Sequence, residues 1–197
     1  MRMKAYRNDA EAKVTGKARY ADDYSVPGML HMVPVYADYI YARNLQVHRD
    51  QALVQPGCVA VLTASDVPGS SRYGQIEQDY PILSEGIVRS WGEVAALVIG
   101  ETRDQALNAA DHVEITAEPM EPVLSIEDAL DPYAPVIPAG KESNIVVHHR
   151  LRRGNAEAAF EQCELVIEQE FRTQVVEQAY MEPESCLCIP RHDGVLE

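Results

Sequence analysis

Residues 94–117, VAALVIGETRDQALNAADHVEITA, carry the clearest secondary-structure pattern in the chain. The apolar run 94–99 predicts a strand. Thr102 then stands at the N-cap of a helix, with Gln105 at the capping-box position three residues later. Alanine and leucine recur at helical spacing over 106–110, and apolar and polar residues alternate over 112–117, which predicts a returning strand. We therefore expect a βαβ-type unit or its split relative.

The residues before this unit are expected to add further short strands. Residues 29–36 predict an apolar strand, and Pro34 within it indicates a sheet edge or a bulge. Residues 58–62 are an unbroken apolar run, which predicts a strand covered on both faces. Weaker signals predict an extended segment over 13–20, a turn at 26–28, a strand around 45–47, a helical turn at 50–53, a loop at 68–78, and a short strand and turn over 86–93.

A proline-rich stretch follows the unit and predicts a linker. The prolines between residues 118 and 144 are Pro119, Pro122, Pro132, Pro135 and Pro138, interrupted by one helical turn over 125–130. Beyond it we expect a strand at 144–147, a helix over 156–162 capped by Asn155, and a long strand over 165–173. Ala159, Phe160 and Cys163 would face a core from that helix.

The last residues predict a β-hairpin. A short apolar strand at 186–189 leads into Pro190-Arg191-His192-Asp193-Gly194, and Asp-Gly tolerates the positive φ angles of tight turns. Because only three residues follow the turn, we expect the second strand to be incomplete and the chain to be cut off inside a larger domain.

Composition narrows the function classes. The chain has 197 residues, 46% of them hydrophobic, and a formal net charge of −14. That is enough apolar material for a sizeable core, and the acidic charge is spread out as on a solvated surface. Such a surface repels phosphate backbones and anionic membranes, so nucleic-acid and membrane partners are not expected. The longest apolar run is too short to cross a bilayer, and we expect a soluble, cytoplasmic protein.

Cysteine and histidine spacing gives no metal site. Cys58, Cys163, Cys186 and Cys188 form no C-x-x-C pair, and buried free thiols are the favoured interpretation. Cys186 and Cys188 would point to the same side of a strand, where a disulfide between them has poor geometry. The histidines are scattered. We therefore expect no metal ligands.

Residues 175–186, VVEQAYMEPESC, place carboxylates beside apolar side chains. If Tyr180 and Met181 enclose a pocket, the pKa of Glu182 would be raised and the carboxyl could hydrogen-bond a substrate or handle a proton. Alternatively, Glu182 is a surface carboxylate at the Pro183 bend. Nucleotide-binding, esterase and zincin motifs are absent from the sequence.

Four stretches together carry a family resemblance: residues 9–23, 56–66, 88–95 and 155–160. They resemble, in the expected order, the opening of the molybdenum-binding subunit of the xanthine dehydrogenase and aldehyde oxidase family. The resemblance implies an α+β fold: an α/β hammerhead domain over residues 1–122, a linker over 123–154, and the truncated first segment of a molybdopterin-binding domain over 155–197.

The resemblance also implies site residues and cofactors. The stretch 178–183 matches the part of the family that approaches the active site, and Glu182 matches a residue that faces the substrate in purine-oxidising members. In other members the matching residue serves the pocket wall or the structure. Gln178 stands where many relatives have His. No cofactor-binding residue is expected within the chain, because the molybdopterin contacts and the catalytic base of the family lie in later sequence.

The function implied for the parent enzyme is hydroxylation of a heteroaromatic ring or an aldehyde carbon with oxygen from water. Molybdopterin with molybdenum would serve the parent, and iron-sulfur clusters and FAD would lie on other domains or subunits, with a homo-oligomer as one assembly. The 197-residue chain alone is expected to be inactive. The alternative is a non-catalytic protein-interaction or assembly module on a hammerhead scaffold.

Overall fold

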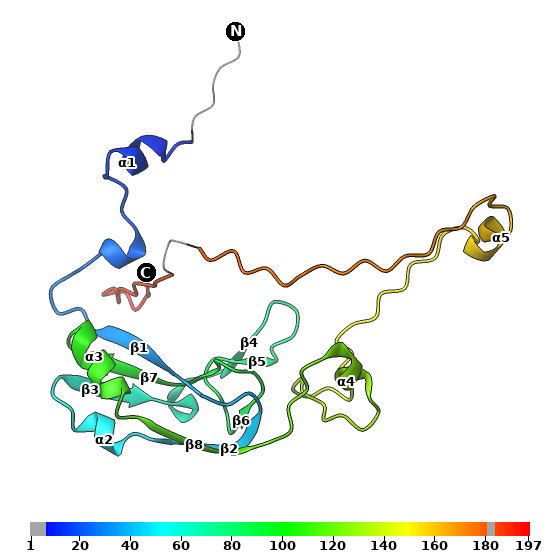
Figure 1. Cartoon of the computed structure of the whole chain (residues 1–197). Coiled ribbons are helices and arrows are strands. Elements are labelled where there is room, and N and C mark those ends of the chain that lie inside the picture. Colours follow the sequence, from blue (N-terminus) through cyan, green and yellow to red (C-terminus); the bar gives the residue numbers. More distant parts are fainter. Residues whose placement is uncertain (1–6, 181–183) are drawn as a thin grey trace, which may run out of the picture. The chain divides into compact units, whose positions relative to one another are not determined.

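The computed structural model describes residues 7–180 and 184–197. These fall into two units, which are described separately below: residues 28–152, and a second set made of residues 7–27 with the described part of 153–197. The sheets belong to residues 28–152 (Figure 1). The buried hydrophobic side chains also lie in this unit.

The strand β7 (Val94–Gly100) is the centre of the first sheet. It lies between β1 (His31–Tyr36) and β3 (Cys58–Leu62), and both pairings are antiparallel (Figure 1). β1 is an edge strand, and its register shifts between Val35 and Tyr36. This confirms the expectation that Pro34 marks an edge or a bulge, because proline cannot donate to a central ladder.

Two helices contact this sheet. The helix α3 (Arg103–Ala110) contacts β7 and β1, and α2 (Asp50–Leu53) contacts β3. The Thr102 hydroxyl caps α3 as expected, because its oxygen accepts from the Gln105 N–H at 3.2 Å. The buried residues Ala52, Val61, Ala96, Val98 and Ala109 form the core between them.

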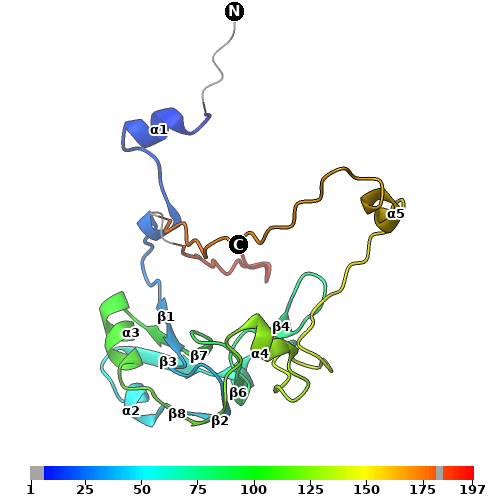
Figure 2. The same ribbon diagram turned by 45° about the vertical axis from the view of Figure 1, so that its right-hand side comes forward.

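The second sheet has the order β6 (Ile87–Val88), β2 (Ala42–His48), β8 (Glu114–Pro119), and its pairings are antiparallel (Figure 2). A second core cluster of Ala37, Ala42, Val88 and Ala95 lies here. The strand, helix and strand of residues 94–117 therefore form, but β7 and β8 belong to different sheets. The expectation of a βαβ-type unit or its split relative was wrong, because each strand pairs with a distant partner rather than in one parallel sheet.

A bulge shapes the pairing of β2 with β8. The register shifts between Arg43 and Gln46, and Asn44 adopts a φ of 55°, a left-handed conformation that asparagine tolerates better than most residues. The Glu118 carboxylate of β8 accepts from Arg43 Nε at 3.0 Å and from Asn44 Nδ2 at 2.9 Å. These bonds hold both strands at the irregularity.

Residues 58–62 form a strand, but it is not covered on both faces. β3 is an edge strand in which Val61 is buried while Val59 is 49% exposed. The expected loop at 68–78 also contains β4 (Arg72–Tyr73), which pairs with β5 (Tyr80–Pro81). The expected helical turns are confirmed at α2 and at α4 (Ile126–Leu130).

Residues 123–144 are held by side-chain bonds. Ser125 Oγ caps α4 by accepting from the Asp128 N–H at 3.0 Å. Asn144 accepts from the Ile137 N–H at 2.8 Å and donates to the Pro135 carbonyl at 3.0 Å. This part of the expected linker is therefore folded back on itself.

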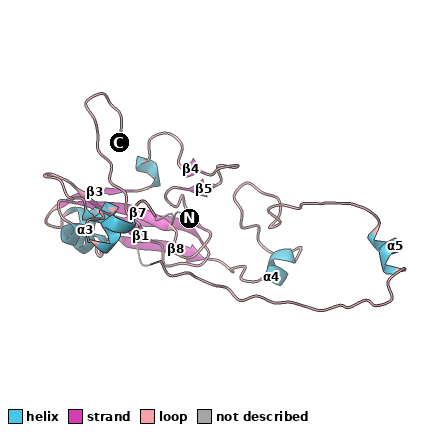
Figure 3. Cartoon of the chain, turned by 90° about the horizontal axis from the view of Figure 1, so that it is seen from above, coloured by secondary structure: helices cyan, strands magenta, loops and turns pink. Residues whose placement is uncertain are grey.

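The second set contains short elements. These are α1 (Ala10–Val14), the 3₁₀ turn η1 (Ala21–Asp23) and α5 (Ala156–Phe160), with loop on either side of α5 (Figure 3). The extended segment expected at 13–20 was wrong at its start, because residues 13 and 14 end α1. The turn at Pro27-Gly28 and the Asn155 cap, which accepts from the Ala158 N–H at 3.2 Å, are confirmed.

Two expected strands are not found among the described residues. Residues 144–147 and 165–173 are loop, with Val146, Ile167 and Phe171 exposed. The expected core contacts of Ala159, Phe160 and Cys163 are also absent there, since all three are exposed. An apolar segment becomes a strand only where another strand supplies its hydrogen bonds, and no described strand does so here.

The predicted turn at the end of the chain is confirmed, with one isolated bridge between Pro190 and Leu196 around it, but the strand expected at 186–189 was wrong, because those residues are loop. Ile189 and Glu197 exchange backbone hydrogen bonds of 2.7 and 2.9 Å, and the Arg191 N–H donates to the Val195 carbonyl at 2.8 Å. Gly194 has a φ of 82°, which explains the glycine after Asp193.

Candidate functional site

Glu93 is the buried ionisable residue of the 28–152 unit. It immediately precedes β7 and is 5% exposed. Its Oε1 accepts from the N–H groups of Arg89 at 2.8 Å and Ser90 at 3.1 Å, and its Oε2 accepts from the Ser84 hydroxyl at 2.9 Å. A buried carboxylate is stable only with such donors, so Glu93 joins the 84 and 89–92 segments at the start of the central strand.

A hollow of about 220 Å³ lies beside this carboxylate. Ser84, which donates to Glu93, also lines the hollow. The remaining lining residues come from β2, from β7 and from the segments around residues 63–65 and 85–86: Leu45, Val47, Thr63, Ala64, Ser65, Glu85, Gly86 and Ala95.

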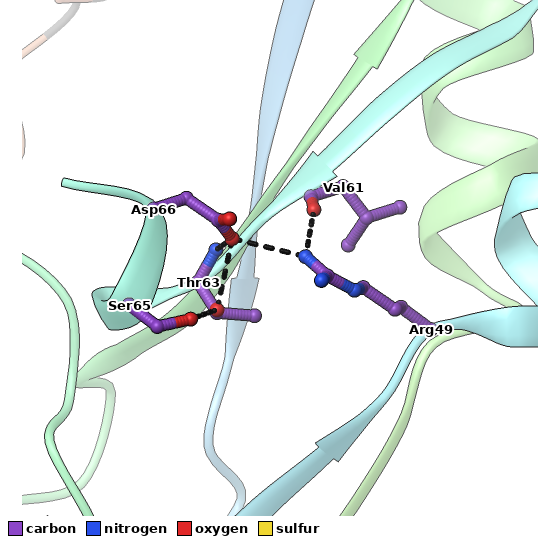
Figure 4. A network of polar contacts seen from close by, with 5 residues as sticks. All are labelled: Arg49, Val61, Thr63, Ser65 and Asp66. Atoms are coloured by element: carbon purple, nitrogen blue, oxygen red, sulfur yellow. Dashed lines mark hydrogen bonds and ion pairs between the residues drawn. The ribbon is translucent and has the colours of Figure 1, made fainter.

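Thr63 and Ser65, which line one rim of the hollow, belong to a network of polar contacts. Figure 4 shows this network. Arg49 Nη1 donates to the Val61 carbonyl and to Asp66 Oδ2, both at 2.9 Å. The same carboxylate oxygen accepts from the Thr63 N–H at 2.8 Å and from the Thr63 hydroxyl at 3.0 Å, while the Thr63 and Ser65 hydroxyls lie 2.9 Å apart. The rim is thereby fixed to strand β3.

The two carboxyl groups near the hollow, Asp66 and Glu85, are stabilised in their charged form. The Thr63 N–H and hydroxyl, followed by Arg49, lower the pKa of Asp66 below its ordinary value of 3.8. Bonds from the Ser71 hydroxyl and then Arg72 lower the pKa of Glu85. A general base near neutral pH needs a raised carboxyl pKa, so these two groups are suited to holding structure rather than to moving protons.

The pKa of Tyr80 is raised, whereas the pKa values of Asp66 and Glu85 are lowered. Partial burial raises the pKa of its hydroxyl, and the negative charge of Glu93 adds to the effect. Its ring packs edge-to-face on Tyr73 at 5.3 Å between centroids. The pair closes the β4–β5 hairpin, and the raised pKa keeps the Tyr80 hydroxyl protonated at neutral pH.

The stretch expected from the sequence to carry the site, residues 175–186, is only partly described. Glu182 and Met181 lie outside the described residues. Tyr180, which was expected to help enclose a pocket, is 81% exposed, and Glu184 is exposed as well. The described part of 175–186 therefore shows no enclosed carboxylate.

The cysteines are free thiols. Cys58 is half-buried, and Cys163, Cys186 and Cys188 are exposed, so the expectation that all four are buried was wrong. Within residues 7–180 and 184–197, no three His, Cys, Asp or Glu side chains are arranged to hold a metal ion.

Sequence reasoning missed Glu93 and the Arg49–Asp66 pair. Thr63-Ala64-Ser65-Asp66 has the capping-box spacing, and its reciprocal bonds form around the 3₁₀ turn η2 (Ala64–Asp66). That signal could have identified Asp66. No comparable local signal shows that Glu93 is buried, because one of its donors is the Ser84 hydroxyl, nine residues earlier, and the other two are backbone N–H groups of Arg89 and Ser90.

Comparison with known proteins agrees with this architecture. The sequence model described as the aldehyde oxidase and xanthine dehydrogenase a/b hammerhead domain matches residues 15–121. The chain belongs to the aldehyde oxidase and xanthine dehydrogenase family. A second model, the molybdopterin cofactor-binding domain, matches residues 137–197. The family resemblance and the α+β fold with a hammerhead domain are therefore confirmed.

Curated relatives are similar along almost the whole chain. The nicotinate dehydrogenase large molybdopterin subunit of Eubacterium barkeri is 32% identical over 95% of this chain and 44% of its own length. Xanthine dehydrogenase 1 of Arabidopsis thaliana is 32% identical over 90% of this chain and 13% of its own length. The chain thus spans less than half of either relative.

Solved structures show the same fold. The aldehyde oxidoreductase from Desulfovibrio gigas is 30% identical, with a TM-score of 0.64 over 68% of this chain and 16% of that one. The CO dehydrogenase from Oligotropha carboxidovorans is 29% identical, with a TM-score of 0.63 over 68% of this chain and 17% of that one.

The described residues do not by themselves fit a molybdopterin. A pterin with its phosphate needs convergent polar donors in an enclosed site. Among residues 7–180 and 184–197, every buried side-chain nitrogen or oxygen already has a hydrogen-bond partner. The described part of 137–197 is largely exposed loop. No chemical step is therefore assigned to these residues through that cofactor.

No helix in the described ranges is long and apolar enough to cross a bilayer.

Proposed function

We propose that this chain supplies the hammerhead domain and the start of the molybdopterin-binding domain of a molybdenum hydroxylase. The observation that carries the proposal is the order of the two family matches, residues 15–121 and then 137–197. The relatives are named as nicotinate dehydrogenase, xanthine dehydrogenase and aldehyde oxidase proteins. The whole protein would hydroxylate a heteroaromatic or aldehyde carbon with oxygen from water, using molybdopterin with molybdenum.

Electrons would leave the molybdenum through iron-sulfur clusters and FAD on other domains or subunits. The relative from Eubacterium barkeri supports this division, since its name describes a large molybdopterin subunit and so implies at least one other subunit. In this arrangement the 28–152 unit is a scaffold. Its titratable groups support that role, because Asp66 and Glu85 are held in the charged form by neighbouring donors.

The domain boundaries are part of the proposal: a hammerhead over 1–122, a linker over 123–154 and the second domain from 155. Limited proteolysis tests them, with first cleavage expected in 145–154, where the chain is exposed loop. First cleavage within 28–119 would contradict these limits. A cytoplasmic location, supported by exposed free thiols, is tested by cell fractionation.

The experiment for the function uses the chain in its native host with an affinity tag at its N-terminus. The purified assembly should contain molybdenum, iron and flavin, and should transfer ¹⁸O from labelled water into an N-heteroaromatic compound or an aldehyde. An assembly without molybdenum, or a product labelled from O₂ instead of water, would overturn the proposal.

Glu182 is the residue we propose to face the substrate. Because a substrate-facing carboxylate acts in the assembled enzyme, Glu182→Ala should lower kcat/KM at least about tenfold, equal to about 1.4 kcal/mol of transition-state binding. Molybdenum content and the thermal unfolding of the assembly should stay unchanged. Glu184→Ala, two residues away and exposed, is the matched control. If both variants have the same kinetics, Glu182 does not face the substrate and is a surface carboxylate at the Pro183 bend.

A non-catalytic interaction or assembly module is the second candidate function. The exposed apolar side chains outside the 28–152 unit favour it, among them Leu165, Ile167, Phe171 and Val175. In that case the tagged chain would copurify with protein partners but without molybdenum or hydroxylase activity. A homo-oligomer is one form such an assembly could take, and light scattering would detect it.

A further inference from the structure

Two cysteines that the proposed function does not use stand just before the backbone-bonded residues at the end of the chain. Cys188 directly precedes Ile189, whose N–H and carbonyl both bond to Glu197. Cys186 and Cys188 are exposed, while Leu187 between them is half-buried. Alternate residues of an extended backbone point to the same side, so the two thiols share one face.

The separation of the two sulfur atoms is short. Cys186 Sγ lies 3.8 Å from Cys188 Sγ. A disulfide needs about 2.05 Å between sulfurs, so the pair is a dithiol at this spacing. A single tetrahedral metal ion with metal–sulfur bonds of about 2.3 Å would reach both sulfurs with an S–metal–S angle of about 110°.

We propose that Cys186 and Cys188 form a two-thiolate site for a thiophilic d¹⁰ metal ion of the Zn²⁺ and Cd²⁺ class. The sulfur spacing matches one edge of a tetrahedral coordination shell without backbone movement. Thiolates are the ligands that such soft and borderline cations prefer. Exposure leaves the other coordination positions to water or to a ligand from outside, so binding is weaker than at a site with four protein ligands.

Metal binding at the two cysteines is coupled to the release of their thiol protons. Two thiolates whose sulfur atoms lie 3.8 Å apart repel one another. A cation between the sulfurs removes that repulsion, and each thiol releases its proton as its metal–sulfur bond forms. Affinity should therefore rise as the pH is raised.

The experiment uses the reduced full chain and Cd²⁺ as the probe. Ultraviolet titration should give a thiolate-to-cadmium charge-transfer band that saturates at one ion per chain, with protection of two thiols from a thiol reagent. Cys186→Ser and Cys188→Ser should each abolish the band. Cys163→Ser changes an exposed cysteine that is distant in sequence from the pair. It is the matched control and should keep the charge-transfer band.

Three results would overturn the proposal. They are a reduced wild-type chain that takes up no Cd²⁺, a Cys186→Ser or Cys188→Ser variant that keeps the band, and a pair that remains oxidised as a disulfide under reducing conditions. Because both cysteines are exposed, the serine variants should fold, and circular dichroism checks this directly. Failure here leaves the hydroxylase proposal intact, since that proposal is tested by molybdenum and ¹⁸O.

Discussion

Replacing Glu93 tests the idea that one buried carboxylate organises the start of the central strand. In Glu93→Ala, the Ser84 hydroxyl and the N–H groups of Arg89 and Ser90 lose their acceptor. A buried donor left without a partner costs about 1–3 kcal/mol, and Arg89, which is only half-buried, and Ser90 can turn in part to water instead. We therefore expect a loss of about 4 kcal/mol, a large fraction of the ~5–15 kcal/mol that stabilises a typical domain.

The matched variant is Glu93→Gln. Its amide oxygen can still accept from both backbone N–H groups, and its amide nitrogen can donate to the Ser84 oxygen, so the expected loss is only about 1 kcal/mol. Urea unfolding at neutral pH, followed by circular dichroism and by the fluorescence of Trp91, measures both. Trp91 is the single tryptophan of the chain and lies two residues from Glu93.

Two results would refute this reasoning. If Glu93→Ala unfolds within about 1 kcal/mol of the wild type, the carboxylate does not hold the turn. If Glu93→Gln loses as much stability as Glu93→Ala, the negative charge matters rather than the accepted hydrogen bonds. Ser84→Ala, which removes one donor and leaves Glu93 with two, should fall between the wild type and Glu93→Ala.

Two further predictions concern helix packing and acid sensitivity. A Cβ on Gly100 would lie 2.6 Å from the Ala106 nitrogen, so Gly100→Ala should push α3 from the sheet and cost about 1–3 kcal/mol, or about 4 °C of Tm per kcal/mol. Gly154 lies outside the 28–152 unit and has open space around it; its φ of 74° strains an alanine locally, but Gly154→Ala should leave the unfolding transition of the 28–152 unit unchanged, and equal losses would contradict the steric argument. The lowered pKa of Asp66 contributes stability that is fully present above its ordinary value of 3.8 and is lost as the pH falls from there through the lower pKa of the folded state. Asp66→Asn should therefore flatten the stability profile as the pH falls through the acid range, measured by urea unfolding, whereas an unchanged slope would assign the acid sensitivity to other carboxylates.

The sequence predicted local structure better than pairing. The 94–117 pattern predicted β7, α3 and β8 correctly, because periodicity and capping are local. It could not show that β7 bonds to β1 and β3 while β8 bonds to β2, because strand partners are chosen by packing over long distances in the chain. The βαβ interpretation failed for this reason.

The strands expected at 144–147 and 165–173 failed for a related reason. Their apolar residues favour extended backbone, and the segments are indeed not helical. A strand, however, is defined by hydrogen bonds to a neighbour, and local composition does not say whether one is present. The terminal turn was predictable because the turn and its single bridge lie within residues 189–197, whereas the strand expected at 186–189 did not form.

The candidate site was only partly predictable. The substrate-facing role of Glu182 came from the family resemblance and stays a prediction. Arg49 and Asp66 are 17 positions apart, and nothing local in the sequence indicates that they meet at the Val61 carbonyl. The sequence around Glu93 predicts only a polar residue after a turn, although the side chain is buried among its hydrogen-bond donors.

The central position of β7 also sets an order of events during synthesis. His31 pairs with Gly100, and Ala42 pairs with Pro119, so neither sheet can close until most of the unit has been translated. Contacts between residues so far apart form slowly, because the loops between them must first be closed. While the ribosome is adding residues 62–100, the apolar strands β1 and β3 have no partner. That interval is when a chaperone would have the most exposed surface to bind on this chain.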